Sequence, residues 1–436
     1  MSGRRDSAAG ECTGEMRVDM AIDVEDVEDD EDDGGKFYTI PSCNCDSCKD
    51  IGTVTPEAMD QLKAEAQWKR ALVQFNITFL GPSLGMAAFT GLWRSLTAEF
   101  WFDVPTEVST VLWFITLVLF TVSMLLYIGR MFLSLEMTRR EFSCNRSVNF
   151  FYAPLICMAG LITSAPDFLR YDLLSRVMFY VLLVYQLGLS LYLYGDWLFG
   201  RKYTLLWVSP AQQMAIIGNF LVASVGAQQG DCDGSMLLFM VGALFWLIVV
   251  VGLFLRLSLS YKTQHEEPNP TLVLFIAPPA AAALAWLLIN QAEGKTDPYD
   301  NIVSFFFFID FFFYLMVLRL SGTLQHQPFA VSFWALIFPS STAASAALIV
   351  AFQMDNVFWK VIATVMVILA CVAMIYVALK TMIDLTRGKF VRDPNSLNVY
   401  AIKKFMHGVS VPELPDTTAR TGIPGRSAPP EPPARR

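Results

Sequence analysis

The stretch PTLVLFIAPPAAAALAW at residues 270–286 contains no charged residue, and a helix that crosses a bilayer needs about 20 apolar positions. A second stretch, FAVSFWALIFPSSTA at residues 329–343, has the same character. Both combine bulky apolar residues with proline and with runs of small residues, which let membrane helices approach one another closely. The two stretches therefore predict an all-α membrane protein.

The composition of the whole chain agrees with this prediction. Of its 436 residues, 54% are hydrophobic and only 17% are charged, and the mean hydropathy is +0.44. This balance excludes a soluble multidomain protein, and the helical pattern excludes a single-pass receptor and an outer-membrane barrel. We place ten transmembrane helices, at residues 71–96, 107–132, 148–166, 172–195, 208–228, 235–257, 270–291, 301–319, 327–351 and 357–382.

Polar segments flank this ten-helix membrane domain, which we assign to residues 69–385. Residues 1–50 hold 15 acidic and 5 basic residues, so we interpret residues 1–68 as a disordered acidic cytosolic tail without a cleavable signal peptide. Residues 386–436 form a second cytosolic tail, Pro-rich at its end. Lysine and arginine are concentrated in the loops after even-numbered helices, which places both termini in the cytoplasm.

Proline divides the ten helices into two sets. Every odd-numbered helix contains at least one proline well inside or near the start of its span and no even-numbered helix does; these prolines include Pro82, Pro154, Pro210, Pro278, Pro279 and Pro339. Because proline frees a backbone carbonyl, which in lipid needs a neighbouring helix or a wet cavity, we expect the kinked odd-numbered helices to lie inside. We predict five helical hairpins around a central pore, with odd helices inner and even helices outer. The alternative is that prolines and small residues only pack a helical bundle.

Such a pore would be neutral, since the interiors of the odd-numbered helices contain no Lys, Arg, His, Asp or Glu. Weak hydrogen-bond donors and helix-dipole ends lower the cost of an anion without trapping it, and favour easily dehydrated anions such as nitrate. A bulky aromatic residue in the pore would close it. Phe338 is the candidate, because it directly precedes Pro339 in the middle of the ninth helix.

These segments resemble the slow-type anion channel family of plant guard cells, which is grouped with bacterial tellurite-resistance proteins and yeast malate transporters. The resemblance covers residues 70–386 and includes RREFSCNRSVNFFYAP at 139–154, GNFLVA at 218–223 and the two stretches quoted above. It implies a homotrimer of ten-helix protomers, each with its own pore for small anions. It also implies that Phe338 plugs the pore and that Gly81 or Gly85 leaves space for its ring.

From the helix pattern and the resemblance we select candidate residues. The expected pore-lining residues are Phe75, Gly81, Gly85, Phe151, Pro154, Gly218, Asn219, Phe275, Pro278 and Pro339. Arg140 and Glu141 are expected to pair at the cytosolic mouth, where they attract anions; the alternative is an ordinary solvated loop pair. Ser7 and Ser427 follow arginines and are candidate phosphosites for a protein kinase. Family members have long basic N-terminal tails, so the acidic tail here argues against the same kinase circuit.

Other polar residues favour structural interpretations. Asp310, in the middle of the eighth helix, is expected to have a structural role more than a proton-coupling one. Cys43, Cys45 and Cys48 lack a nearby fourth ligand, so we expect no metal site. We also expect neither a cofactor nor a nucleic-acid partner. The helices contain no catalytic constellation, which argues against an enzyme.

We therefore predict a passive plasma-membrane channel for nitrate and chloride, gated by Phe338 and regulated through its cytosolic tails. The alternatives are a carrier of malate or another dicarboxylate, which a proton gradient would drive, and an efflux protein for sulfite or oxyanions. A carrier would show saturable, pH-dependent uptake, whereas a channel would show currents that reverse with the anion gradient. Anion preference, the resting state of the gate and the activating signal are left open by the sequence.

Overall fold

The structure is a computed structural model that describes residues 72, 75–99, 101, 104–144, 147–169, 172–199, 208–263, 270–324 and 329–387. Within these residues every regular element is helical. The predicted tails, the candidate phosphosites Ser7 and Ser427, and the cysteines at 43, 45 and 48 lie outside the described residues.

Five helices form the inside of the bundle, and we call them the inner helices. They are α4 (Gly81–Glu99), α7 (Ala153–Thr163), α9 (Gln213–Gln228), α11 (Ala277–Ala292) and α13 (Ile337–Met354). Each contacts two others, in the closed order α4, α7, α9, α11, α13 and back to α4. Small residues permit this close packing. Residues 280–283 of α11, for example, are four consecutive alanines that are all buried.

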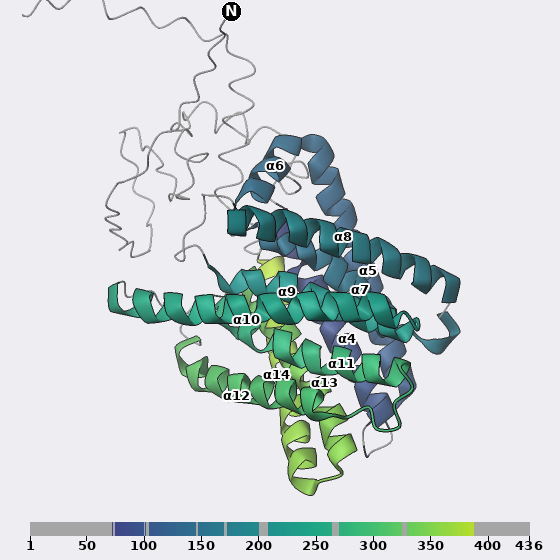
Figure 1. Cartoon of the computed structure of the whole chain (residues 1–436). Coiled ribbons are helices and arrows are strands. Elements are labelled where there is room, and N and C mark those ends of the chain that lie inside the picture. Colours follow the sequence, from purple (N-terminus) through teal and green to yellow (C-terminus); the bar gives the residue numbers. More distant parts are fainter. Residues whose placement is uncertain are drawn as a thin grey trace, which may run out of the picture.

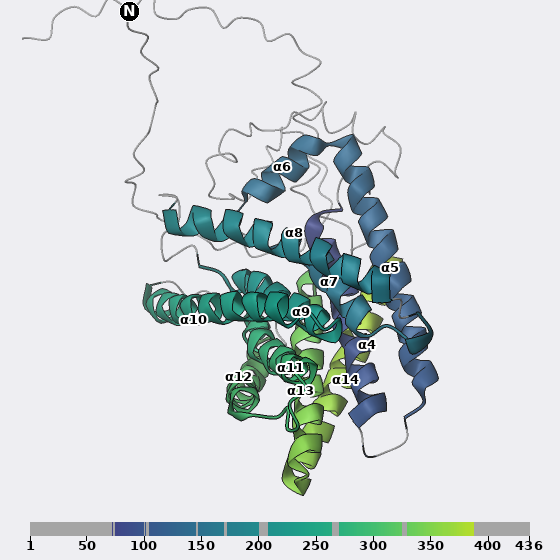
Figure 2. The same cartoon turned by 45° about the vertical axis from the view of Figure 1, so that its right-hand side comes forward.

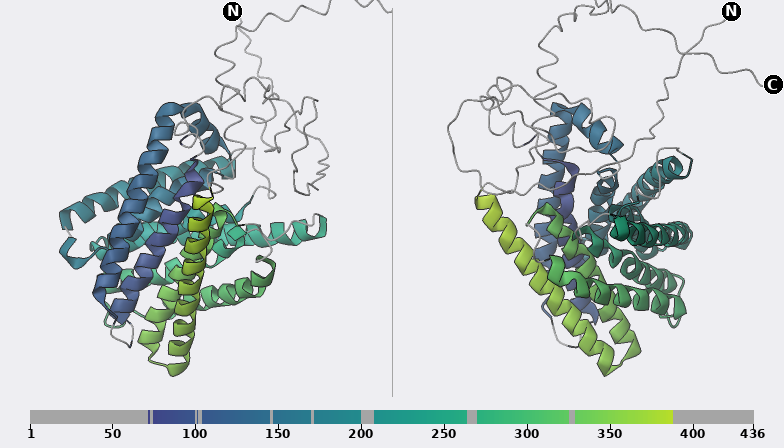
Figure 3. Two further views of the ribbon diagram at one scale, coloured as in Figure 1. Left: turned by 180° about the vertical axis from the view of Figure 1, so that it is seen from behind. Right: turned by 90° about the vertical axis from the view of Figure 1, so that its left-hand side faces the viewer.

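Five longer helices lie on the outside, and we call them the outer helices. They are α5 (Thr106–Leu133), α8 (Asp172–Phe199), α10 (Cys232–Thr263), α12 (Asn301–Leu324) and α14 (Val357–Thr386). Each follows an inner helix in the chain and packs against it. Figure 1 shows α11 between α10 and α12, and Figure 2 shows the same arrangement after a turn. The back of the bundle is formed by α4, α5 and α14 (Figure 3).

Burial separates the two sets of helices. In the most apolar windows of α11 and α13, 83% and 78% of residues are buried, against 22% to 39% for the five outer helices. The residues that the outer helices leave exposed include large apolar side chains along their length. An exposed apolar surface of this extent is compatible with lipid and not with water.

Seven helices in the described part of the chain are long and apolar enough to cross a membrane, so this is a multi-pass membrane protein. They are the five outer helices together with the segments Leu272–Ala292 and Val331–Met354. An eighth span results if α6 (Leu135–Ser143) and the segment Val148–Thr163, which are bent by 107° relative to each other, count as one. Each of the ten predicted spans contains a helix. However, α4 and α9 are not among the helices that are long and apolar enough to cross a membrane, so the number ten stays a prediction.

Prolines mark the point where each inner helix begins. Each is preceded by a 3₁₀ segment: η1 (Ile77–Leu80), η2 (Val148–Tyr152), η5 (Pro210–Gln212), η6 (Pro270–Phe275) and η7 (Val331–Leu336). Four of the inner helices carry a proline as their second or third residue, namely Pro82, Pro154, Pro278 and Pro339, whereas before α9 the proline is Pro210, the first residue of η5. The first turn of a helix is where proline is tolerated, since its N–H groups have no partner within the helix. The expected kinks are therefore junctions between two kinds of helix.

The 3₁₀ segments also fix the direction of the inner helices. η1 contacts η2 and η7, η5 contacts η2 and η6, and η6 contacts η7, so the five segments form a second closed cycle, which we call the 3₁₀ ring. Because each segment directly precedes its inner helix, all five inner helices begin at the same end of the bundle. They consequently run in the same direction, and their dipoles add.

Candidate anion path along the inner helices

Phe338 lies in the first turn of α13, two residues after η7 ends. Its side chain is 2% exposed, and Pro339 beside it is also buried. The carbonyl of Phe338 accepts a hydrogen bond from Thr342 Oγ1 at 2.8 Å, which is a contact within α13. Within the described residues its ring contacts no other aromatic ring, unlike many other phenylalanines of the bundle.

Gly81 and Gly85 bring α4 against α13, and Phe338 is not their nearest neighbour. A Cβ atom at Gly85 would lie 2.9 Å from the ring of Trp334 and 3.2 Å from Cβ of Ile337. A Cβ at Gly81 would lie 3.5 Å from Cβ of Trp334. Trp334 is itself fixed by its indole N–H, which donates to Thr381 Oγ1 on α14 at 3.0 Å. The glycines thus set the distance between α4 and the segment that carries Phe338.

Replacement of Gly85 by alanine is expected to lower the free energy of unfolding by about 1–3 kcal/mol, because the added methyl group overlaps with Trp334. Gly91 on the same helix is the matched control, since a Cβ there meets nothing within 4 Å. Gly91→Ala should be neutral or stabilising by about 0.5–1 kcal/mol, because alanine is the better helix former. Thermal unfolding of the two detergent-solubilised variants tests this difference, and equal midpoints would contradict it.

Gly218 and Asn219 of α9 contact outer helices. A Cβ at Gly218 would lie 2.5 Å from Oε1 of Gln186 on α8, so glycine makes room for this glutamine. Asn219 is fully buried; its Nδ2 donates to the carbonyl of Ala215 at 3.2 Å, and its Cβ lies 3.0 Å from the position that a Cβ at Gly242 of α10 would take. The backbone of α9 at this level is therefore packed against α8 and α10.

The aromatic candidates contact different parts of the bundle. Phe275 packs against Phe254 of α10 and Phe313 of α12, with ring centroids 5.8 and 5.9 Å away. Phe151 in η2 meets Phe142 of α6 at 5.1 Å. The remaining candidates lie at the starts of inner helices: Phe75 stacks on Phe79, Pro154 begins α7 and Pro278 begins α11. The candidate pore-lining residues therefore do not all contact one another. Phe338 lies where α4 packs against α13, near the candidates Gly81 and Gly85.

Arg140 and Glu141 do not pair with each other, which corrects the expectation from sequence. Glu141 forms an ion pair with Arg130, with 2.7 Å between Oε1 and Nη1. Arg140 instead pairs with Glu136, with 3.4 Å between Nε and Oε1. Arg130 is 1% exposed and lies at the end of α5, where Tyr127 Oη also donates to Glu141 at 3.2 Å. Arg140 and Glu136 are partly exposed. Adjacent residues on a helix point in different directions, and α6 turns Glu141 back toward α5.

The hydroxyl groups of α13 are mostly occupied by their own helix. Ser340, Thr342 and Ser345 each donate to the carbonyl four residues earlier, at 2.8 to 3.0 Å. Ser341 is fully buried, and its hydroxyl has no partner among the described residues. A serine without a backbone acceptor keeps its proton available, so Ser341 is the hydroxyl on α13 best suited to donate to a passing anion.

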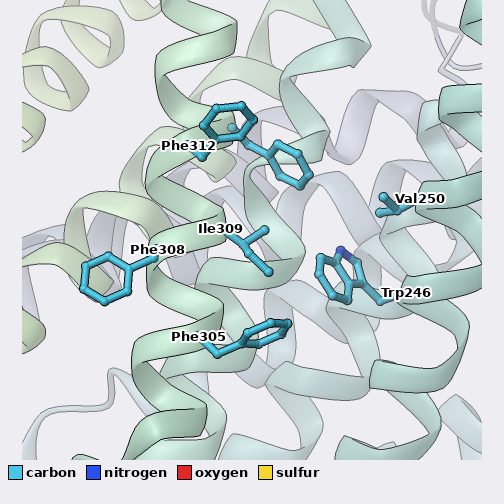
Figure 4. A pocket seen from close by; sticks show the side chains of 7 residues that line it. Trp246, Val250, Phe305, Phe308, Ile309 and Phe312 are labelled. Carbon is cyan, nitrogen blue, oxygen red and sulfur yellow. The ribbon is translucent and has the colours of Figure 1, made fainter.

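Two features of the outer helices complete the description. Asp310 of α12 is fully buried, and neither of its carboxyl oxygens has a partner in the described part of the chain. A cavity of about 510 Å³ lies between α10 and α12 and is lined by apolar side chains that include Trp246, Phe305 and Phe312 (Figure 4). This cavity faces the outside of the bundle and offers nothing to a small hydrophilic ion.

Together, the exposed apolar surface of the outer helices and the closed cycle of buried inner helices define a helical membrane protein. The chain belongs to the voltage-dependent anion channel family, which matches residues 74–382. It is 31% identical to the S-type anion channel SLAH2 of Arabidopsis thaliana over 299 residues, which cover 68% of this chain and 56% of that protein. It is 28% identical to the guard cell S-type anion channel SLAC1 of the same plant, over 76% of this chain and 60% of that protein. The chain thus spans little more than half the length of these relatives.

Proposed function

We propose that the protein is a channel that passes small monovalent anions, nitrate and chloride, passively between the five inner helices. The observation that carries this proposal is the parallel arrangement of these helices, whose N-terminal ends meet at the 3₁₀ ring. Each N-terminal end carries a partial positive charge, which attracts an anion. Apart from Arg94 near the C-terminal end of α4, the 3₁₀ ring and the inner helices contain no lysine or arginine that would hold the anion too tightly for conduction.

The same proposal includes the architecture around the path. Ten transmembrane helices form five hairpins with both termini in the cytoplasm of a plasma-membrane protein, and three chains assemble into a homotrimer. A protein kinase acts on the cytosolic tails. The lysines and arginines of the loops after outer helices support this orientation, and the relatives that carry the name S-type anion channel support the ion class.

Phe338 is the proposed gate of this path. Support comes from its burial and from its place between the 3₁₀ ring and α13, where it is followed by Pro339. An aromatic ring at such a point excludes both water and ions. Movement of Trp334 or of α4 would change the space around the ring, because Gly85 couples these elements.

Voltage-clamp recording from cells that express the chain tests the conducting function. When external chloride is replaced by nitrate or malate, the reversal potential should follow the gradient of the monovalent anion. If no current develops and malate uptake instead saturates and increases with acid, the protein is a carrier. Uptake that depends on sulfite or another oxyanion would favour an efflux protein.

A further inference from the structure

A small cavity lies off the axis of the inner helices. It has a volume of about 30 Å³ and is bounded by Asn149 of η2, by Tyr194 and Trp197 of the outer helix α8, and by Gln212 and Ala215 at the start of α9. Because α8 supplies part of its wall, the cavity is separate from the path between the inner helices. About 10–15 Å³ is enough for one water molecule, so there is room for one or two waters or for one small ion.

Two polar side chains of the cavity have no partner among the described residues. Tyr194 is 7% exposed, and its hydroxyl makes no hydrogen bond there. Its ring is stacked on Phe245 at 3.6 Å, which fixes the direction of the hydroxyl. The Oε1 atom of Gln212 is also buried and unpaired. A buried polar atom without a partner costs about 1–3 kcal/mol, so an occupant that bonds to these groups would stabilise the fold. Because Oε1 only accepts hydrogen bonds, an anion can bond to Gln212 only when the amide turns its NH₂ group into the cavity.

The surroundings favour a negative occupant. The cavity lies between the start of η2 and the start of α9, and Gln212 occupies the N-cap position of α9 without forming a side-chain cap. The N-terminal end of α9 carries partial positive charge. No acidic residue lines the cavity; Asp196, the nearest acidic residue in the sequence of α8, is not part of its wall. The amide of Gln212 can rotate to present its NH₂ group, and the phenol of Tyr194 donates one proton.

The apolar part of the wall narrows the choice of ion. Leu193 and Trp197 cannot replace the water shell of a strongly hydrated ion, and the volume is too small for a dicarboxylate. We propose that the cavity is a binding site for one small monovalent anion such as chloride, held by the hydroxyl of Tyr194 and the amide of Gln212. The bound anion joins α8 to η2 and to the start of α9 and is not conducted. This assignment does not require that the inner helices conduct.

The site predicts that chloride stabilises the purified protein. In detergent at constant ionic strength, exchange of gluconate for chloride should raise the midpoint of thermal unfolding by about 2 °C or more and then saturate. Tyr194→Phe, which removes only the hydroxyl, and Gln212→Leu should abolish this rise. Tyr192→Phe, at a tyrosine of α8 that is 54% exposed, should retain it. Phe338→Ala should retain it too, which separates this site from the proposed gate.

Two outcomes would overturn the assignment: no saturable rise in the wild-type protein, or an undiminished rise in Tyr194→Phe, which would place the ion elsewhere and leave only water in the cavity. If both variants fail to fold, bromide-exchanged crystals of the wild-type protein decide. An anomalous peak between Tyr194 and Gln212 supports the site, and the absence of a peak there rejects it.

Discussion

Replacement of Phe338 by alanine is expected to increase the anion current by about tenfold or more at equal surface expression, because it removes the ring proposed to close the path. The residue is 2% exposed, so its side chain lies inside the bundle. Whole-cell current divided by surface-labelled protein is the appropriate measurement. The reversal potential should not move, since the ring blocks the path without selecting the ion.

Phe333→Ala is the matched control for this experiment. Phe333 lies in η7, near Phe338 in sequence, and packs against Phe329 with ring centroids 5.2 Å apart. Phe333→Ala therefore removes the same number of atoms near the same helix start without opening the proposed gate.

Phe338→Leu is a milder second variant. Removal of a buried phenylalanine lowers the free energy of unfolding by about 3–5 kcal/mol, whereas leucine keeps most of the side chain and should give a smaller increase in current. A current from Phe338→Ala that equals wild type at normal surface expression would reject Phe338 as the gate.

Replacement of Arg130 by methionine is expected to lower the free energy of unfolding by about 3–5 kcal/mol, because it leaves the carboxylate of Glu141 without its buried partner. Arg140→Met is the matched control. Arg140 and Glu136 form an ion pair whose two side chains are each 40% exposed, and such a pair is worth about 0–1 kcal/mol. Thermal unfolding of the two variants in detergent measures the difference.

A double variant makes the test of Arg130 more specific. Arg130→Met combined with Glu141→Leu removes both charges, so it should recover much of the stability that Arg130→Met alone loses. The midpoint of the double variant should therefore lie above that of the single variant. If Arg130→Met unfolds at the same temperature as Arg140→Met, the ion pair between α5 and α6 does not stabilise the fold.

Composition and proline spacing predicted the all-helical fold, because apolar length and the missing N–H of proline act locally. The same local reasoning could not predict which side of an inner helix faces the axis. α9 is buried on nearly all sides, so its sequence has no polar face to indicate direction. Gly218 illustrates the result: its small size was interpreted as space for the pore, whereas it accommodates Gln186 of α8.

Contacts between residues that lie far apart in the chain also could not be predicted from local sequence patterns. Arg130 lies at the end of α5, and only the turn between α5 and α6 brings Glu141 to it. One overlooked signal was available: the polar residues Gln186, Ser190 and Tyr194 of α8 recur every four positions in an apolar helix. This spacing places them on one face, and all three are buried.

The common direction of the inner helices has an electrical consequence. Each helix carries about half a positive charge at its N-terminal end and half a negative charge at its other end. Five of them begin at the 3₁₀ ring, so the two mouths of a path between them differ in potential. If anions pass between these helices as proposed, the current in identical salt on both sides should rectify, because anions enter more easily at the 3₁₀ ring than at the opposite mouth. With that ring on the cytoplasmic side, as the loop charges predict, we expect the outward movement of anions to be the easier one.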